Sequence, residues 1–525
     1  MKFSIFGSNN KIIFLVFLTI FLVFFWSSEV GLFSINLLLG LLFVFIILTI
    51  QHRFLRSGLL FFYMISAFLA IPIKLKYGFL STSMVMASVG TGQRAILATI
   101  GTINFVSFLC FIALSVVFIY ISFNSKNISL KLKYKFLMIL LFLLVLSKPL
   151  VEGMSDWGER FYINNVKYDP TFISQPYLDQ FPIFFGPIIS AVSVKANDIV
   201  NNKIYTLIEH NSLPKYVKKE ESNQNNIILI IGESSNPHRY GIYGYDKDTT
   251  PYLQKLEDNG KLYKSQNVHS PAAQTRLAVP MLVSFSTPKH KKQLFKYKNV
   301  LEMAKEQKYK TYWFDAQMQN NMWNKPFGFI SKYADVRLVP DGNNTEFPIN
   351  EGDDLKLLSY VKEYFSKPAE KNFYVIHLMG NHLPYSYNGG QDVSFLNDNY
   401  DKSIYGVNQI INSIYTYADK YLKDYTLIYV SDHGEVVNVG HGYPTKENEM
   451  YKIPLLTNRY EVSKEIDSMR DSHGYFSSSN LKYIIMELIG YQVKENKIKD
   501  AVANSDYVLD EQERIVKFSE LIDIN

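Results

Sequence analysis

Five long apolar runs in the first 150 residues limit what this chain can fold into. Short polar breaks separate the runs, which cover residues 12–28, 31–50, 59–73, 101–122 and 136–147. A helix needs about 20 apolar residues to cross the hydrocarbon core of a bilayer. We therefore expect five membrane-spanning helices, of which the third and fifth need their flanking residues to reach that length. A removable signal peptide is the alternative for the first run, but no small-residue cleavage site follows it.

Basic residues predict how these helices are oriented, because cytoplasmic loops of membrane proteins carry an excess of Lys and Arg. One cluster, His52, Arg53 and Arg56, lies between the second and third runs. A second cluster, between the fourth and fifth runs, contains Lys126, Lys131, Lys133 and Lys135. Both loops should face the cytoplasm, so everything after Pro149 should lie on the far side of the membrane.

Charge and cysteine content narrow the class of protein further. The net charge of +6 is small for 525 residues and lies partly in the cytoplasmic loops, so it gives no reason to expect a nucleic-acid partner. The single cysteine, Cys110, falls inside a predicted span. The exported part of the chain therefore has no disulfide, although exported proteins often use them.

The exported part begins with a connecting region. Residues 181–199 are aromatic and amphipathic, and residues 215–226 are charged and rich in amides. We expect an interfacial helix and linker over 151–223, although a helical cap on the next domain fits equally well. This divides the chain into a transmembrane domain of five helices over 1–150, the linker region, and a globular domain over 224–525.

The globular domain alternates short β-branched runs with helical patterns. Strands are predicted at 227–231, 310–314, 373–377 and 425–430, and helices at 299–307 and 354–366. After Lys494 the chain continues as a charged, helix-like segment. This alternation is typical of a largely parallel sheet covered by helices, in which functional residues gather beyond the carboxyl ends of the strands.

Potential metal ligands follow these strands. Glu233 comes directly after the first strand, where Gly232 would permit a tight turn, and Asp432 with His433 follows the fourth. Carboxylates and imidazoles are zinc ligands. Taken alone, Glu233 could equally be a helix-capping acid. His382, in a turn after the third strand, and His441, on a later loop, add two imidazoles at the same expected edge.

Thr275 is the candidate nucleophile. It lies in the segment 270–280, where small residues precede an apolar run, a pattern that predicts a loop entering a buried helix. A hydroxyl bound to zinc loses its proton far more readily than one in water. A helix N-cap is the alternative role for this threonine.

Together these residues resemble the membrane-bound phosphoethanolamine transferases of Gram-negative envelopes, within the alkaline phosphatase and sulfatase superfamily. The resemblance covers nearly the whole chain. Besides the five-span anchor, it rests on the motifs at 232–235, 240–245, 249–251, 275–280, 379–382, 400–404 and 431–435.

The resemblance implies a five-helix transmembrane bundle and an alkaline-phosphatase-like (sulfatase-type) periplasmic domain, in the inner membrane of a Gram-negative bacterium. It implies a zinc ion (Zn2+) held by Glu233, Thr275, Asp432 and His433. Thr275 would carry the transferred group, and His382 and His441 would bind its phosphate or a second zinc. The implied donor is phosphatidylethanolamine and the acceptor lipopolysaccharide or lipooligosaccharide, at lipid A or a core heptose, with the enzyme acting as a monomer.

Three departures from the family concern the substrates. No cysteines flank the threonine loop, Arg94 replaces an acidic residue in the substrate-facing loop 82–95, and the donor-contacting stretch 315–325 has diverged. The missing disulfides favour a core sugar over lipid A as acceptor.

Three other functions fit parts of the pattern. A phosphoglycerol transferase of the lipoteichoic-acid-synthase type shares the five spans and the zinc-bound threonine, but residues 379–382 and 240–245 favour phosphoethanolamine transfer. A sulfatase or phosphodiesterase would release its group to water, but a type I sulfatase needs a Cys/Ser-x-Pro-x-Arg motif, whereas Arg276 directly follows Thr275. The third alternative, a non-catalytic envelope protein, conflicts with a complete set of zinc ligands.

Overall fold

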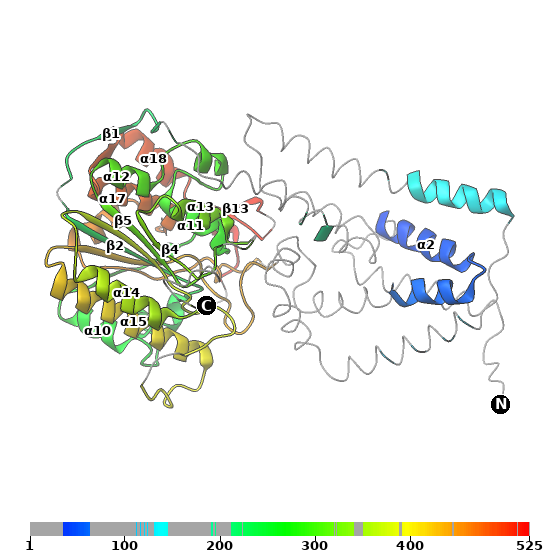
Figure 1. Ribbon diagram of the computed structural model, residues 1–525, viewed down its shortest axis with the longest axis horizontal. Helices are drawn as coiled ribbons and strands as arrows, with labels where there is room; N and C mark the ends of the chain where they lie inside the picture. The colour runs from blue at the N-terminus through cyan, green and yellow to red at the C-terminus, as the bar shows by residue number, and fades with distance from the viewer. Residues whose placement is uncertain are drawn as a thin grey trace. The chain divides into compact units, whose positions relative to one another are not determined.

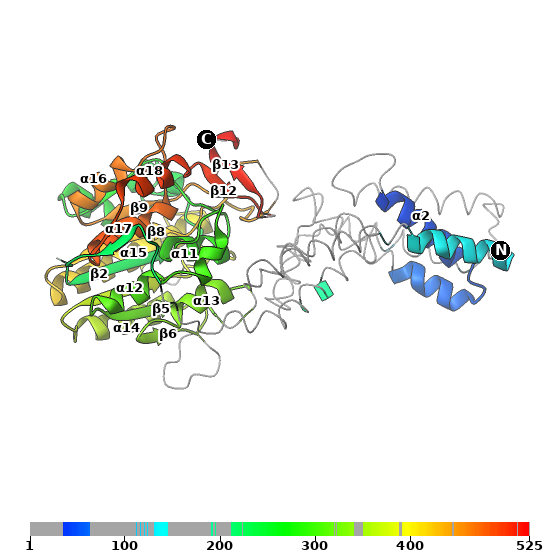
Figure 2. The ribbon, with the colours of Figure 1, turned by 90° about the horizontal axis from the view of Figure 1, so that it is seen from above.

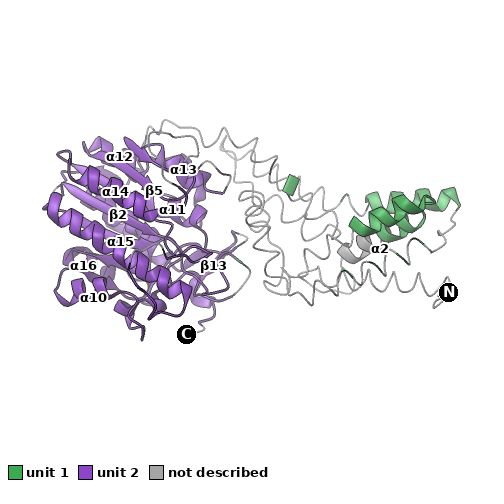
Figure 3. Cartoon of the chain, turned by 60° about the horizontal axis from the view of Figure 1, so that its bottom comes forward, with its two compact units in different colours: residues 1–204, 443–445 green, residues 205–442, 446–525 purple. Residues whose placement is uncertain are grey.

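The computed structural model describes most of the second half of the chain and parts of the first. The described ranges are 35–62, 131–144, 212–222, 224–319, 323–340, 350–387, 391–443, 446–511 and 513–523, with single residues 112, 116, 120, 123, 147, 191, 192, 195, 210 and 321. The chain forms two compact units, residues 1–204 with 443–445 and residues 205–442 with 446–525 (Figure 3).

Helices make up the described part of the first unit. Helix α2 (Ile35–Leu48) lies within the second predicted span, and residues 53–62 and 132–144 are also helical. Among the described residues, no helix combines the length and apolar character that crossing a membrane requires. The first predicted span and most of the third and fourth lie outside the described residues, as do the loop 82–95 and nearly all of the helix expected at 181–199.

A seven-stranded sheet in the order β3-β9-β8-β2-β7-β5-β6 is the centre of the second unit (Figure 1). Its strands are β2 (Asn226–Gly232), β3 (Tyr263–Ser265), β5 (Lys310–Asp315), β6 (Val336–Leu338), β7 (Asn372–His377), β8 (Thr426–Ser431) and β9 (Leu455–Thr457). Strands β8, β2, β7, β5 and β6 are parallel, and β9 and β3 form an antiparallel edge.

The four predicted strands are confirmed as β2, β5, β7 and β8, and the two predicted helices as α12 (Val300–Glu306) and α14 (Asp354–Phe365). Strands β3, β6 and β9 were not predicted. Each has only three residues, which is too short to show the periodicity that identifies a strand.

Helices cover both faces of the sheet (Figures 1 and 2). One layer contains α14, α10 (Pro251–Asp258) and α15 (Asn399–Tyr421). The other contains α12, α11 (Thr275–Val283), α13 (Lys325–Ser331) and α17 (Leu481–Leu488). Ile227 and Leu229 of β2 pack into the second layer, whereas Ile228 and Ile230 pack into the first. A strand buried on both faces has no polar alternation, which explains its continuous apolar run.

Shorter elements complete this unit. Helices α16 (Tyr460–Ser468) and α18 (Glu495–Ala503) precede an antiparallel hairpin of β12 (Tyr507–Leu509) and β13 (Ile515–Lys517). Two further strand pairs are β1 (Val217–Lys219) with β11 (Tyr491–Val493) and β4 (Val268–His269) with β10 (Phe476–Ser477). Short 3-10 helices occupy Pro237–Arg239, Gly241–Tyr243, Lys291–Phe295, Ser478–Asn480 and Phe518–Glu520. The predicted helical tail is therefore α18, and the hairpin after it was not predicted.

The register of the parallel strands brings their carboxyl ends to one edge of the sheet. Gly232 of β2 lies opposite Ser431 of β8, and Ile231 lies opposite His377 of β7. The residues that follow these three strands are therefore neighbours in space although more than 190 positions separate the first turn from the last.

Candidate active site and metal centre

Glu233 lies in a sharp turn at the end of β2. The turn is made by Ser234, whose φ of 53° is in the left-handed region, and not by Gly232 as predicted. Gly232 is required for a different reason, since a Cβ there would lie 2.5 Å from the hydroxyl of Tyr429. A non-glycine residue held in this region stores about 1–3 kcal/mol of strain. No helix begins at Glu233, so the capping role is excluded.

The turn after β8 is tied to the turn after β2. Oδ1 of Asp432 accepts hydrogen bonds from the backbone N–H of His433 at 2.7 Å and of Ser234 at 3.2 Å. Oδ2 of Asp432 is buried and accepts no hydrogen bond from any described residue. It lies instead 3.3 Å from Nε2 of His433. One carboxylate oxygen therefore organises the two turns while the other remains available to a ligand.

Thr275 is the first residue of α11, one position after the N-cap residue Gln274. Its hydroxyl donates a hydrogen bond of 3.0 Å to Oε2 of Glu233 and lies 3.3 Å from Nε2 of His433. The N-cap role considered for Thr275 is therefore wrong. Its backbone position at the start of a helix also places it where the helix dipole favours negative charge.

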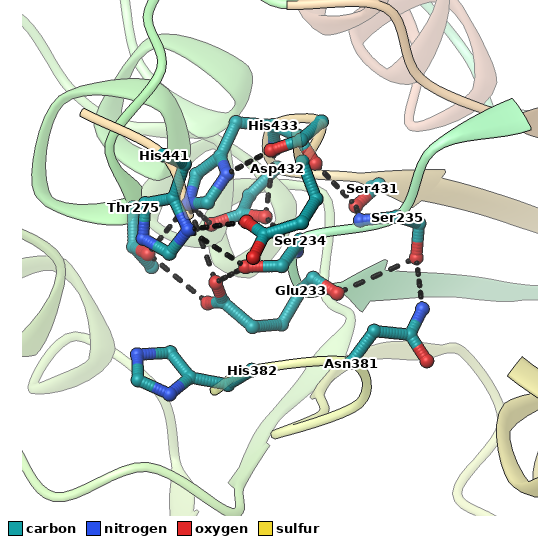
Figure 4. Close-up of polar contacts among 12 residues, drawn as sticks. Glu233, Ser234, Ser235, Thr275, Asn381, His382, Ser431, Asp432, His433 and His441 are labelled. Atoms are coloured by element: carbon teal, nitrogen blue, oxygen red, sulfur yellow. Dashed lines mark hydrogen bonds and ion pairs between the residues drawn. The ribbon is translucent and has the colours of Figure 1, made fainter. Parts of the chain in front are cut away.

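Glu233, Thr275, Asp432 and His433 converge on one small space (Figure 4). Nε2 of His433 is 3.2 Å from Oε1 of Glu233, and the side chains of both residues are fully buried. The structure thus brings together all four residues that the sequence assigned to one metal ion.

The charges in this space call for a cation. Burial and the neighbouring Glu233 raise the pKa of Asp432 to about 6. Burial lowers the pKa of His433, but Asp432 and Glu233 outweigh it and raise that pKa to about 10. Burial raises the pKa of Glu233, and His433 more than offsets this and holds it well below its usual value. A proton on His433 offsets one of the two negative charges of the carboxylates, and a divalent cation in its place would offset both.

The donor set fits zinc. Nδ1 of His433 lies 2.9 Å from the backbone oxygen of Gly434. A proton held on Nδ1 directs Nε2 toward the carboxylates, as hydrogen bonds at the outer nitrogen do for metal-binding histidines. Two carboxylates, one imidazole and one hydroxyl are all ligand types that zinc accepts.

His441 and His382 lie on one side of this centre. The ring of His441 is 4.1 Å from that of His433 and 5.8 Å from that of His382. A nitrogen of His441 lies within 4.8 Å of ligand atoms of Glu233 and His433. Its Nδ1 is 2.7 Å from Oε2 of Glu435. His382 is half-buried, and its Nδ1 lies 2.5 Å from the backbone oxygen of Leu383.

Two residues of the site were missed in the sequence. His377, the last residue of β7, is fully buried, and one of its nitrogens lies within 4.8 Å of carboxylate oxygens of Glu233 and Asp432. Nε2 of Gln317 donates to Oε2 of Glu233 at 2.8 Å. His377 ends a predicted strand, so its position was a usable signal, whereas Gln317 lies in the diverged stretch 315–325, where the sequence singled out no individual residue.

Comparison with known proteins identifies the family to which this domain is similar. The Sulfatase family matches residues 225–491, just over half of the chain. Phosphoethanolamine transferase EptC of Escherichia coli K12 is 25% identical over 323 residues, which cover 55% of this chain and 56% of that protein. Phosphoethanolamine transferase EptA of Helicobacter pylori is 25% identical over 269 residues, or 46% of this chain and 49% of that protein. The chain thus spans about half the length of the curated relatives it matches.

A solved structure extends the similarity beyond the globular domain. The integral membrane protein lipooligosaccharide phosphoethanolamine transferase A of Neisseria meningitidis shares the fold with a TM-score of 0.58 at 17% identity, over 93% of this chain and 96% of that one. The expected sulfatase-type α/β domain is confirmed, and the five-helix bundle stays a prediction. By its fold and by the match over residues 225–491, the chain belongs to the Sulfatase family.

Proposed function

We propose that this protein is a zinc-dependent phosphoethanolamine transferase that uses Thr275 as its nucleophile. The observation that carries the proposal is the position of the Thr275 hydroxyl, 3.0 Å from Glu233 and 3.3 Å from His433 inside a buried, acidic centre. The names of the relatives from E. coli, H. pylori and N. meningitidis support the same reaction.

Glu233, Thr275, Asp432 and His433 would hold the zinc ion. When bound, it would lower the pKa of the Thr275 hydroxyl and offset negative charge on phosphoryl oxygens. Glu233 orients that hydroxyl through the hydrogen bond to its Oε2. Because the pKa of Glu233 is held well below its usual value, this carboxylate is a weak base and its main task is orientation.

The reaction would take place in two steps. Oγ1 of Thr275 attacks the phosphorus of phosphatidylethanolamine and loses its proton, while the bond from phosphorus to the diacylglycerol oxygen breaks and that oxygen takes up a proton. An acceptor oxygen then attacks the same phosphorus and loses its proton. The bond to Oγ1 breaks, and Thr275 regains its hydroxyl.

His382 and His441 would serve the groups that arrive and leave. Both rings form a hydrogen bond at Nδ1, to the backbone oxygen of Leu383 and to Glu435 respectively, and Nε2 would be the nitrogen that meets a substrate. An imidazole can donate to a phosphoryl oxygen or protonate a leaving oxygen. A second zinc at these two residues is the other role we consider for them.

The proposed setting is the inner membrane of a Gram-negative bacterium. Residues 1–150 would form a five-helix anchor, 151–223 an interfacial helix and linker, and 224–525 the periplasmic catalytic domain. The acceptor would be lipopolysaccharide or lipooligosaccharide, at a core heptose or lipid A, and the enzyme would act as a monomer.

The experiment that tests this function is the mass of the covalent intermediate. The full-length protein, in detergent with zinc, is incubated with phosphatidylethanolamine and analysed by intact-protein and peptide mass spectrometry. A mass increase equal to phosphoethanolamine on the peptide containing Thr275 is expected. Thr275→Ala should abolish it, Thr275→Ser should retain part of it, and Thr416→Ala, at an exposed position of α15, should leave it unchanged.

Other results would exclude the proposal. Modification of Thr275 by phosphatidylglycerol but not by phosphatidylethanolamine would favour the phosphoglycerol transferase. An unmodified Thr275 with both lipids would reject transfer through this residue. If phosphatidylethanolamine does modify Thr275, the mass of envelope glycolipids from cells with and without the protein would identify the acceptor.

A further inference from the structure

Gln274 is a buried residue with an unsatisfied side chain next to the nucleophile. Only 2% of it is exposed, and neither Oε1 nor Nε2 of its carboxamide has a hydrogen-bond partner within the described part of the chain. Buried polar groups are nearly always paired, and one that is not costs folding free energy. Folding alone therefore does not explain a glutamine here.

Helix capping does not explain it either. Gln274 is the N-cap residue of α11, yet its side chain caps no backbone N–H. Its backbone oxygen accepts from the N–H groups of Leu277 and Ala278 at 3.0 and 2.9 Å. A smaller N-cap residue would provide the same backbone oxygen and its own capping oxygen.

The side chain extends toward the loop that carries His441. A Cβ on Gly442 would lie 2.9 Å from Cγ and 3.1 Å from Nε2 of Gln274, and Gly442 has a φ of 62°. Gly442 directly follows His441, whose ring is 4.1 Å from that of His433. The carboxamide thus lies against the loop that carries His441, and its own residue directly precedes Thr275.

We propose that the carboxamide of Gln274 binds the phosphoethanolamine group carried on Thr275. Nε2–H would donate to a phosphoryl oxygen, and Oε1 would accept from the ammonium group. This inference rests on the proposed function. One carboxamide offers a donor and an acceptor side by side, and phosphoethanolamine presents both complementary groups, an anionic oxygen and an N–H donor. Phosphoglycerol and sulfate lack the ammonium group.

Two variants of the full-length protein test this role. Gln274→Met keeps the approximate shape and removes both hydrogen-bonding groups, and Gln274→Glu keeps an acceptor and places a negative charge toward the phosphoryl group. The readout is the rate of Thr275 modification at increasing concentrations of phosphatidylethanolamine, by intact-protein mass spectrometry. We expect Gln274→Met to lower the second-order rate constant about 10- to 100-fold and Gln274→Glu to lower it further.

Thermal stability gives a second readout that does not depend on activity. Gln274→Met should raise Tm by about 2 °C, because it removes two unpaired buried groups. The matched control is Gln319, which is also buried but whose carboxamide bonds to Asp315, Ser331 and Arg337. Gln319→Met should therefore lower Tm.

The possible failures are distinct. If the wild type and Gln274→Met are modified at Thr275 at equal rates, this inference is overturned and the proposed function stays intact. A fall in Tm for Gln274→Met as large as that for Gln319→Met also overturns it, since the carboxamide would then be structural. A wild-type protein that phosphatidylethanolamine does not modify overturns both.

Discussion

Gln317 donates a hydrogen bond of 2.8 Å from its side-chain amide to Oε2 of Glu233, the same oxygen that accepts from Thr275. A second hydrogen bond, to the backbone oxygen of Leu378 at 3.1 Å, holds the amide in place. Gln317 therefore fixes the orientation of a proposed zinc ligand. Because removing such outer partners costs about 10- to 100-fold in metal affinity, we expect that loss for Gln317→Leu.

The measurement is zinc affinity against a competing chelator. Gln254→Leu is the control and should bind zinc like the wild type, because this amide on α10 bonds to two neighbouring acidic side chains of its own helix. An unchanged zinc affinity in Gln317→Leu would show that the other ligands orient Glu233 without it.

Gln317 also shows how far the sequence could predict the site. Glu233, Asp432 and His433 directly follow strands with strong apolar patterns, and parallel strands bring such residues to one edge. The position of Gln317 depends on the course of the loop after β5, which no periodic pattern determines. The antiparallel edge strands β3 and β9 were missed for a related reason, since tertiary pairing and not local pattern defines a three-residue strand.

Zinc binding should release a proton. The pKa of His433 is raised from 6.5 to about 10 by Asp432 and Glu233 against the effect of burial, so the zinc-free protein carries a proton on His433 at neutral pH. Zinc competes with that proton. We expect zinc affinity to rise about 10-fold per pH unit between about pH 7 and 9, with about one proton released at pH 7.5, measured by calorimetry in buffers of different ionisation enthalpy.

The same proton stabilises the zinc-free fold. A folded-state pKa above the unfolded value contributes stability that is complete below about pH 6.5 and is lost as the pH rises toward 10. The Tm of the zinc-free protein should therefore fall between pH 7 and 9.5, and less so in His433→Asn. A zinc affinity that does not change with pH would show that zinc does not compete with a proton on His433, and would contradict the predicted proton release.

Asp354 positions the turn that carries His382. Asp354 is the first residue of α14 and is buried. Its carboxylate accepts hydrogen bonds from the backbone N–H groups of Met379 at 2.8 Å and Gly380 at 3.0 Å. Asp354→Ala leaves both groups unpaired, so we expect the free energy of unfolding to fall by about 2 kcal/mol. Asp353→Ala removes only the N-cap bond to Lys356. Asp353→Ala should lower the free energy of unfolding by about 1 kcal/mol and leave the rate of Thr275 modification unchanged. Asp354→Ala should slow that modification.

The C-terminal hairpin is tied to α11, the helix that begins at Thr275, through a buried ion pair. Oε1 of Glu513 accepts from Nη1 of Arg276 at 2.6 Å, and both side chains are 1% exposed. Oε2 accepts from Lys291 at 2.6 Å. Glu513→Ala removes one side of a buried ion pair and leaves a cavity at that position, so the free energy of unfolding should fall by about 3–5 kcal/mol.

The matched control for this ion pair is Glu520→Ala, which removes the exposed partner of Lys517. Surface ion pairs contribute about 0–1 kcal/mol, so this variant should unfold like the wild type in urea. Glu513→Gln keeps the shape and one acceptor, and its loss should be smaller than that of Glu513→Ala. If Glu513→Ala loses no more than Glu520→Ala, the ion pair between Glu513 and Arg276 does not stabilise the fold. If Glu513→Ala loses the expected amount of about 3–5 kcal/mol of unfolding free energy, modification of Thr275 should slow as well, because Arg276 is the next residue of the same helix.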